Sequence, residues 1–371
     1  MNPRSIDASA ALQALSTFSA VIDVRTPSEF ALDHLPGAQN WPVLDDAQRA
    51  EIGTLYAQVD PFTANKRGAA LIARNIARHL DMHTGPLPKS WSPLVYCWRG
   101  GNRSGALAHI LARIGFSVTV VQGGYRALRR ALRAQLEQLP ATLQFHVVCG
   151  RTGCGKSRLL HALSEAGAQV LDLEALAQHR GSVLGLEPGT QQPSQKLFES
   201  RLWAVLRGFD PQRPVYVEAE SKKIGALQVP DALMARIRQG RCLALELDLP
   251  LRVQLLLRDY AALGADRELL RQRLHALREL RGAQAVDRWQ QLVTAGQLDT
   301  FTAEILQQHY DPSYQRSMSR NFQHFDGALR LELDGIDAPA FARAAQRVLT
   351  LAQAWPPTAA QPQTPRAAAP G

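Results

Sequence analysis

The sequence predicts an α/β fold built on two parallel β-sheets, each covered by its own helices. Short apolar runs rich in β-branched residues alternate with segments of helical spacing along most of the 371 residues, which is typical of parallel strands joined by helices. At about 150 residues per domain, a chain of this length favours two domains and connecting material. One series of strands ends, and a second begins, close to residues 135–142, so we expect the domain boundary there.

The composition indicates a globular protein with an anionic partner. Hydrophobic residues make up 46% and charged residues 20% of the chain, and the formal net charge is +9. This excess favours a polyanion such as nucleic acid, although an arginine-rich proteome would produce it as well. No apolar run approaches the roughly 18 residues of a membrane span, the N-terminus lacks a signal-peptide pattern, and four cysteines are too few for a disulfide framework. We therefore expect a reduced, cytoplasmic protein without a membrane partner, and the sequence specifies no oligomeric state.

The first domain, residues 1–138, is expected to contain short buried strands connected by helices. Residues 125–139 carry apolar residues at helical spacing and a basic outer face, and Pro140 is expected to end this helix. The other expected elements are strands at 21–25, 93–97 and 117–121 and a helix at 103–114.

The second domain, residues 139–355, repeats the α/β pattern and adds a helical region. Residues 250–296 are almost purely helical by pattern, and a proline- and alanine-rich tail at 356–371 is expected to be disordered. Strands are expected at 145–149, 168–173, 214–219, 242–248 and 329–334, with a closing helix at about 339–354. The helical region carries Arg252, Arg258, Arg267, Arg271, Arg273, Arg278, Arg281 and Arg288.

A cysteine stands at a junction of strand and helix in the first domain. Cys97 ends an apolar strand, the loop WRGGN follows, and Arg103 opens the next helix. The two loop glycines let the backbone curl so that N–H groups point at the sulfur, and the helix N-terminus adds positive charge. Both effects favour the thiolate, which is the nucleophilic form. Cys97, Arg99 and Arg103 are therefore the candidate catalytic residues, with the arginines as partners of an anion.

A glycine-rich pattern lies between the first strand of the second domain and the helix that follows it. The segment GRTGCGKS matches the P-loop, in which backbone amides wrap a phosphate and a lysine reaches its oxygens. The hydroxyl of Ser157 could also ligate Mg²⁺. The candidate binding residues are Gly150, Gly153, Gly155, Lys156 and Ser157.

Two acidic residues follow the strand at 214–219, where a P-loop protein often carries a carboxylate. Glu218 and Glu220 are two positions apart, so they would share one face of a continuous strand. Both are candidate binding residues, and a solvent-exposed edge strand would explain them equally well. Cys149 and Cys154 are expected to fill core and loop positions rather than to form a metal or redox pair.

The segments VIDVRTPSEF (21–30), HLPGAQNWP (34–42) and VVQGGYRAL (120–128) accompany the cysteine loop. With that loop they resemble the rhodanese family of sulfurtransferases, which implies a rhodanese-like first domain in which Cys97 carries a transferable chalcogen. The five residues between Cys97 and Arg103 are one more than simple rhodaneses commonly have. This loop length also resembles that of dual-specificity cell-cycle phosphatases, so phosphatase chemistry stays open.

The motifs CWRGGNRS, GRTGCGKS, VYVEAESKKIG (215–225) and HYDPSY (309–314) occur in this order on one chain. Together they resemble the bacterial tRNA 2-selenouridine synthase family over residues 15–350. The resemblance implies that wobble 2-thiouridine of tRNA becomes S-geranyl-2-thiouridine with geranyl diphosphate, and then 2-selenouridine with selenophosphate. The P-loop would hold the diphosphate, while Cys97 would either accept selenium as a perselenide or position the selenium donor.

Other parts of the chain have expected roles under this resemblance. Residues 250–296 are expected to contact tRNA phosphates, unless their arginines are balanced by neighbouring acids. Trp98 is expected either to stack on the wobble base or to pack against its own loop. HYDPSY is expected to lie where a helix ends, and it has no assigned role.

Three other functions are consistent with the same motifs. The chain could be an ATP-dependent sulfurtransferase acting on another anionic substrate, or a phosphatase-like domain fused to a small-molecule kinase domain. It could also be a noncatalytic RNA-binding regulator, but a binding module needs no nucleophile such as Cys97.

Overall fold

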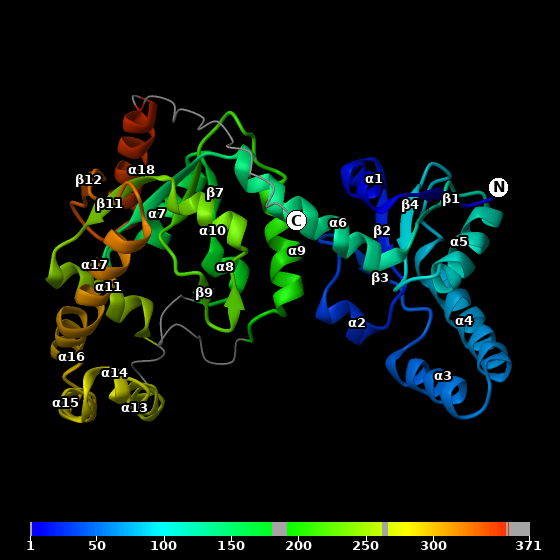
Figure 1. Cartoon of the computed structure of the whole chain (residues 1–371), viewed down its shortest axis with the longest axis horizontal. Coiled ribbons are helices and arrows are strands. Elements are labelled where there is room, and N and C mark those ends of the chain that lie inside the picture. Colours follow the sequence, from blue (N-terminus) through cyan, green and yellow to red (C-terminus); the bar gives the residue numbers. More distant parts are fainter. Residues whose placement is uncertain (1, 180–190, 262–265, 354, 356–371) are drawn as a thin grey trace, which may run out of the picture. The chain divides into compact units, whose positions relative to one another are not determined.

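The computed structural model describes residues 2–179, 191–261, 266–353 and 355 (Figure 1). The expected tail, 356–371, lies outside the described residues. By its internal contacts the chain divides into two compact units, and it first passes from one to the other after Ala141. The first unit comprises Met1–Ala141, Glu174–Gly208 and Ser221–Met234; the second comprises Thr142–Leu173, Phe209–Glu220 and Ala235–Gly371.

The first unit contains a parallel five-stranded sheet in the order β1-β5-β4-β2-β3. Strand β4 lies in the middle, with Pro93 opposite Ala20 of β2 and Leu94 opposite Thr119 of β5. All four of its residues are buried, as its uninterrupted apolar sequence predicts. The strands are β1 (Arg4–Ile6), β2 (Ala20–Asp23), β3 (Gln39–Asn40), β4 (Pro93–Tyr96) and β5 (Thr119–Val121).

Helices of the first unit cover this sheet through apolar faces. The core joins Ile22 and Val95 of the sheet to Ile76 of α4 and Leu107 of α5. Helix α5 both begins and ends at glycines with positive φ, Gly101 and Gly115. The helices are α1 (Ala8–Gln13), 3₁₀-helix η1 (Leu15–Thr17), α2 (Pro27–Leu32), α3 (Asp46–Gln58), α4 (Pro61–His83), α5 (Asn102–Ile114), α6 (Gly124–Thr142) and α9 (Gln195–Leu206), and an antiparallel hairpin joins β9 (Lys223–Ile224) to β10 (Leu227–Gln228).

The prediction that Pro140 ends its helix is wrong. Helix α6 continues to Thr142 with Pro140 buried inside it. A proline removes only its own N–H from the helix, here the bond to the carbonyl of residue 136, and two further residues can still complete the final turn.

The second unit contains another parallel five-stranded sheet, in the order β12-β11-β6-β8-β7. Strand β6 is central, with Val147 opposite Cys242 of β11 and Val217 of β8. The strands are β6 (Phe145–Cys149), β7 (Gln169–Leu171), β8 (Val215–Glu218), β11 (Arg241–Glu246) and β12 (Leu329–Glu332). The expected strands of both units are therefore confirmed, with ends that differ by at most two residues.

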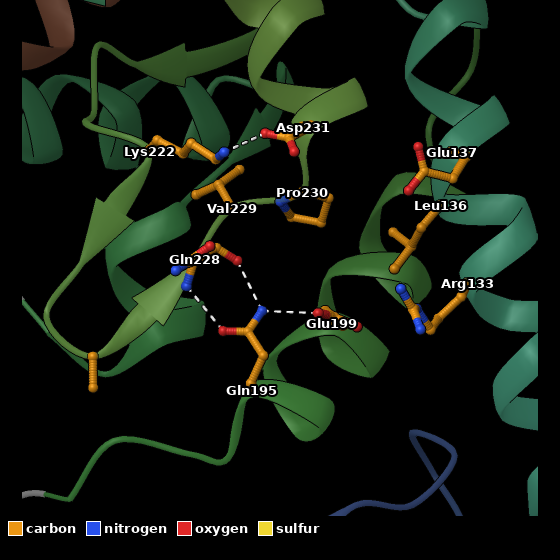
Figure 2. Close-up of a pocket in the computed structure, with 11 residues that line it drawn as sticks. Arg133, Leu136, Glu137, Gln195, Glu199, Lys222, Gln228, Val229, Pro230 and Asp231 are labelled. Carbon is orange, nitrogen blue, oxygen red and sulfur yellow. Dashed lines mark hydrogen bonds and ion pairs between the residues drawn. The ribbon is translucent and has the colours of Figure 1, made fainter.

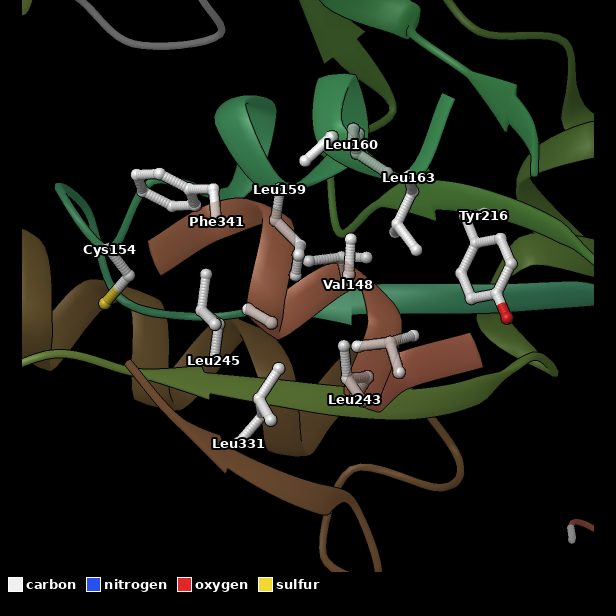
Figure 3. Packing of buried hydrophobic residues seen from close by; sticks show 14 of the residues in the cluster. Val148, Cys154, Leu159, Leu160, Leu163, Tyr216, Leu243, Leu245, Leu331 and Phe341 are labelled. Atoms are coloured by element: carbon white, nitrogen blue, oxygen red, sulfur yellow. The ribbon is translucent and has the colours of Figure 1, made fainter. Parts of the chain in front are cut away.

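Helices α7 and α18 pack on one face of this second sheet (Figure 3). Leu159 and Leu163 of α7 and Phe341 of α18 lie over Val148 and Leu245 of the strands. The described helices of the second unit are α7 (Lys156–Glu165), α11 (Leu249–Asp259), α13 (Arg267–His275), α14 (Arg278–Arg281), α15 (Ala283–Thr294), α16 (Leu298–Ile305), π-helix η2 (Leu306–Tyr310), α17 (Asp311–Asn321) and α18 (Ala338–Gln353). Helix α8 (Leu173–Ala177) belongs almost wholly to the first unit, and α10 (Asp231–Arg238) is divided between the two units. Among the described helices, none combines the length and apolarity needed to cross a bilayer.

Candidate active site

Cys97 lies directly after the central strand of the first unit, where parallel sheets commonly bind ligands. Its side chain is 1% exposed, and the loop that follows turns at Gly100 and Gly101, whose φ values are 75° and 80°. The Ser104 hydroxyl donates a hydrogen bond to the Cys97 sulfur at 3.3 Å. The sulfur in turn donates to the Arg99 carbonyl at 3.5 Å. Within the described residues no loop N–H bonds to the sulfur, so the expectation that loop amides point at it is wrong. Ser104 is visible in the sequence, but only the fold turns its hydroxyl toward the sulfur.

The two candidate arginines, Arg99 in the loop and Arg103 at the start of α5, have different environments. Arg103 donates to the Glu29 carboxylate at 3.0 Å rather than to Cys97. Glu29 is half-buried, which raises its pKa, but hydrogen bonding and charge from Arg103 outweigh this effect and hold the pKa below its usual value. Arg99 is exposed, and no described residue accepts a hydrogen bond from its guanidinium. Arg99 is therefore the cation of this loop that is free to meet an incoming anion.

The N-terminus of α6 holds the cysteine loop in place. The Tyr125 N–H donates to the Cys97 carbonyl at 2.7 Å, and the Arg126 N–H donates to the Trp98 carbonyl at 3.2 Å. A Cβ on Gly124 would lie 2.3 Å from the Cys97 carbonyl oxygen, so only glycine fits there. The Trp98 ring stacks on Tyr125 with centroids 5.3 Å apart. The structure thus shows the packing role for Trp98.

The P-loop follows β6, the central strand of the second unit. Gly153 and Gly155 have φ values of 84° and 81°, and a Cβ on them would lie 2.9 Å from Leu256 and 2.5 Å from Phe341, respectively. Neighbouring side chains therefore leave room only for glycine at these two positions. Gly150 also has a positive φ, 157°.

Glu218 joins the P-loop side chains, as the sequence allowed. Lys156 Nζ donates to the Gly150 carbonyl at 3.0 Å and lies 3.3 Å from the Glu218 carboxylate. The Ser157 hydroxyl donates to the other oxygen of Glu218 at 3.2 Å. Strand β8 ends at Glu218, so Glu220 lies beyond the strand rather than on its face, but the fold still brings the two carboxylates within 4.8 Å of one another.

The cysteines around the P-loop are core residues in the structure. Cys149, Cys154 and Cys242 are free thiols and buried. Burial raises the pKa of the Cys149 and Cys154 thiols above the usual value, which disfavours the reactive thiolate. The burial of Cys149 and Cys154 agrees with the expectation that both side chains serve packing.

The motif HYDPSY supplies contacts to the P-loop that the sequence alone did not assign. Its first two residues end π-helix η2 and the rest begin α17, which follows without a break. The chain therefore stays helical through the motif, where a helix end was expected. The Gly150 N–H donates to the Tyr314 hydroxyl at 2.6 Å. Burial raises the pKa of Tyr314, which keeps its hydroxyl protonated. The sequence shows that the motif is polar and aromatic, but only the fold shows that Tyr314 contacts Gly150, which lies 164 residues away in sequence.

Arg252 was expected to contact tRNA phosphates with the other arginines of residues 250–296, but the structure buries it. Its side chain is 2% exposed and pairs with Asp311 through two hydrogen bonds of 2.6 and 3.0 Å. Its Nε also donates to the Thr152 carbonyl in the P-loop at 2.9 Å. A buried, fully engaged guanidinium supports the loop and has no free face for a tRNA phosphate.

A cavity of about 470 Å³ lies within the first unit, apart from Cys97 (Figure 2). Its walls carry opposite charges, including an ion pair of Lys222 with Asp231 at 2.5 Å. The lining consists of Arg133, Leu136, Glu137, Gln195, Glu199, Lys222, Ala226, Gln228, Val229, Pro230 and Asp231. None of the predicted site residues lines this cavity.

Comparisons with known proteins agree with both motifs. Residues 143–328 match the family model described as tRNA 2-selenouridine synthase AAA domain, and residues 7–131 match the rhodanese-like domain. A protein named tRNA 2-selenouridine synthase from Shewanella denitrificans is 33% identical over 86% of this chain and 93% of its own length. One of the same name from Alcanivorax borkumensis is 38% identical over 65% of this chain. A third protein of this name, from Nitrosomonas europaea, is 34% identical over 65% of this chain. The alignments to the Alcanivorax and Nitrosomonas proteins cover 66% and 63% of those proteins' own lengths, slightly less than two thirds.

Proposed function

The chain belongs to the tRNA 2-selenouridine synthase family, and on that premise we propose that it inserts selenium into tRNA at a wobble 2-thiouridine. One observation carries the proposal: the chain combines a loop with a hydrogen-bonded cysteine and a P-loop with a positioned lysine. The first loop lies within residues 7–131, which match the rhodanese-like domain, and the second lies within residues 143–328, which match the synthase family. We propose that the P-loop serves geranyl transfer from geranyl diphosphate, and that the Cys97 loop serves selenium insertion from selenophosphate.

Geranyl transfer prepares the sulfur to leave. The thiocarbonyl sulfur attacks C1 of geranyl diphosphate, the C1–O bond breaks, pyrophosphate departs with the electron pair of that bond, and N3 of the base releases its proton to solvent. Lys156 and the loop amides would stabilise the negative charge on pyrophosphate as it develops. Lys156 is already held at the loop by the Gly150 carbonyl and Glu218, which supports this role. An alkylated sulfur then leaves as a neutral thiol, whereas the unmodified sulfur would have to leave as an anion.

The P-loop residues fit a bound Mg²⁺. The Ser157 hydroxyl and the Glu218 carboxylate are 3.2 Å apart, and both offer the oxygen ligands that Mg²⁺ prefers. When bound, Mg²⁺ neutralises charge on a diphosphate. Ser157 and Glu218 would hold the ion, and Lys156 would contact the phosphate oxygens beside it.

Selenium insertion exchanges one chalcogen for another without net oxidation. Selenium attacks C2 of the S-geranyl base, the C2–S bond breaks, geranylthiol leaves with a proton, and water takes the phosphoryl group from selenium. A perselenide on Cys97 would need an added two-electron oxidant, whereas positioning the donor needs none. We therefore propose that the Cys97 loop positions selenophosphate, with exposed Arg99 as its cationic contact.

Mass spectrometry of nucleosides tests this function. Thiolated tRNA is incubated with the protein and both donors, and each donor is then omitted in turn. We expect 2-selenouridine with both donors, S-geranyl-2-thiouridine with geranyl diphosphate alone, and unchanged 2-thiouridine with selenophosphate alone. Unchanged 2-thiouridine in every reaction would contradict the proposal, and sulfur transfer stimulated by ATP would favour the sulfurtransferase alternative.

A further inference from the structure

We propose that three exposed arginines on α6, Arg126, Arg130 and Arg133, form the surface that binds the tRNA backbone beside the Cys97 loop. The inference rests on the proposed function, because tRNA is the polyanion which that function requires. The inference names the surface that binds tRNA. This surface differs from residues 250–296, which the sequence analysis expected to contact tRNA.

The three arginines lie in one row along the helix. At about 100° per residue their directions fall within roughly 60° of one another, and they span about 10 Å along the axis. All three side chains are exposed, while Leu128, Leu132 and Leu136 on another face of α6 are buried. The buried leucines fix the helix, so the row of charge is presented to solvent as a rigid unit.

The arginines of this row form no ion pair with the described residues, although the exposed Glu137 follows Arg133 one turn later on the same face of α6 and lines the same cavity. Among the described residues, none accepts a hydrogen bond or ion pair from the side chains of Arg126, Arg130 or Arg133. Their neighbour Arg129 shows the contrast, because it pairs with the Glu199 carboxylate and also donates to the Lys196 carbonyl at 3.2 Å. Arginines that keep their full charge and hydrogen-bonding capacity are suited to phosphate groups.

The arginines of the region 250–296 are mostly engaged with the protein. Arg271, Arg278 and Arg288 pair with Glu268, Asp287 and Glu304 at 3.3, 2.9 and 3.3 Å. Arg281 donates to His309 and Ser313, both at 2.7 Å, and Arg252 is buried against Asp311. A phosphate would have to displace these partners, so this region gains less from binding tRNA than the row on α6.

The position of the row also suits the chemistry. Helix α6 begins at the cysteine loop, where Tyr125 and Arg126 bond to the carbonyls of Cys97 and Trp98. Exposed Arg99 lies in that same loop. An RNA strand bound along the row would therefore run toward the Cys97 loop, where the modified nucleotide is needed.

The test compares two triple variants that remove the same charge. One carries Arg126→Gln, Arg130→Gln and Arg133→Gln; the matched control carries Arg271→Gln, Arg278→Gln and Arg288→Gln. Affinity for unmodified tRNA is measured by fluorescence anisotropy as a function of salt. We expect the α6 variant to bind at least about tenfold more weakly near 0.1 M salt, with a salt slope smaller by about two to three, since each phosphate contact contributes about 0.7–0.9. The control should bind like the wild type.

Further measurements separate failure of this inference from failure of the proposed function. Replacing the three α6 arginines by lysine should restore most of the affinity, because lysine also binds phosphate as a point charge. Thermal unfolding should show that all variants are folded. An α6 glutamine variant that binds tRNA like the wild type, or a control that alone loses affinity, would overturn the surface and leave the function standing. A wild-type protein that binds no tRNA would overturn both.

Discussion

The Cys97 sulfur accepts a hydrogen bond from the Ser104 hydroxyl in the first turn of α5, and this contact fixes the side chain within the loop that is proposed to position selenophosphate. We predict that Ser104→Ala slows selenium insertion by up to about tenfold, because the hydrogen bond that it removes is worth about 0.5–1.5 kcal/mol. Geranyl transfer should not change. The readout is the rate at which isolated S-geranyl-tRNA becomes selenouridine, together with the rate of Cys97 alkylation by iodoacetamide. Ser104→Thr keeps the hydroxyl and should keep both rates; equal rates for the alanine variant would refute the role.

At the P-loop, a tyrosine hydroxyl satisfies the N–H of the first glycine. We predict that Tyr314→Phe raises KM for geranyl diphosphate about tenfold with little change in kcat, because an unpaired buried N–H costs about 1–3 kcal/mol and loosens the loop. Selenium insertion from S-geranyl-tRNA should be unaffected.

The control for Tyr314 is another buried tyrosine of the same unit. The Tyr216 hydroxyl has no partner among the described residues, so Tyr216→Phe should leave KM unchanged and be neutral or stabilising. The same rise in KM in both variants would show that Tyr314 has only a general structural role.

Sequence reasoning identified the residues of both loops but not all of their partners. Motif spacing is local, so it located Cys97 and Lys156 directly. The partners Glu29 and Tyr314 come from segments 74 residues before Arg103 and 164 residues after Gly150, and only the folded chain brings them together.

Among the elements, α6 supports the cysteine loop by a close backbone contact. We predict that Gly124→Ala lowers the free energy of unfolding by about 2 kcal/mol or more and slows selenium insertion, because its Cβ would lie 2.3 Å from the Cys97 carbonyl oxygen at a φ of 58°. The matched control is Gly105→Ala in α5. Nothing lies within 4 Å of a Cβ there, so alanine should stabilise the helix slightly. Urea unfolding and the rate of selenium insertion check both; a neutral Gly124→Ala would contradict the contact.

The strands were predicted better than the helices. Apolar β-branched runs such as FHVVC stand out in a sequence because both faces of a parallel strand are buried. The polar helix α3 was not predicted because it has no buried residue to mark an apolar face. The long helix α4 was also missed, although Leu71 and Ile76 mark a buried face on it. The end of α6 was misplaced because a proline usually ends a helix, whereas here the packing of the helix outweighs the preference of the single residue Pro140.

At the scale of the whole molecule, stability should depend on a buried histidine. Burial, with a smaller effect of the Arg241 charge, lowers the pKa of His146 to about 4, from 6.5 in an exposed histidine. Below pH 6.5 the unfolded chain therefore binds a proton that the folded chain does not bind until about pH 4. We predict that this residue lowers the free energy of unfolding by about 2 kcal/mol between pH 7 and pH 5.

Urea unfolding at the two pH values measures this effect. His146→Phe should reduce the loss of stability at pH 5 by about the same amount. His161, which is 76% exposed, provides the control, and His161→Gln should retain the wild-type dependence. An unchanged pH dependence in His146→Phe would contradict the assignment.

The central claim is that one chain divides the reaction between two loops, and nucleoside mass spectrometry of two variants tests it most directly. With thiolated tRNA and both donors, Cys97→Ala should accumulate S-geranyl-2-thiouridine and form no 2-selenouridine. Lys156→Ala should leave 2-thiouridine largely unmodified, yet convert supplied S-geranyl-tRNA to the selenium product. Full selenium insertion by Cys97→Ala, or unimpaired geranyl transfer by Lys156→Ala, would contradict the account.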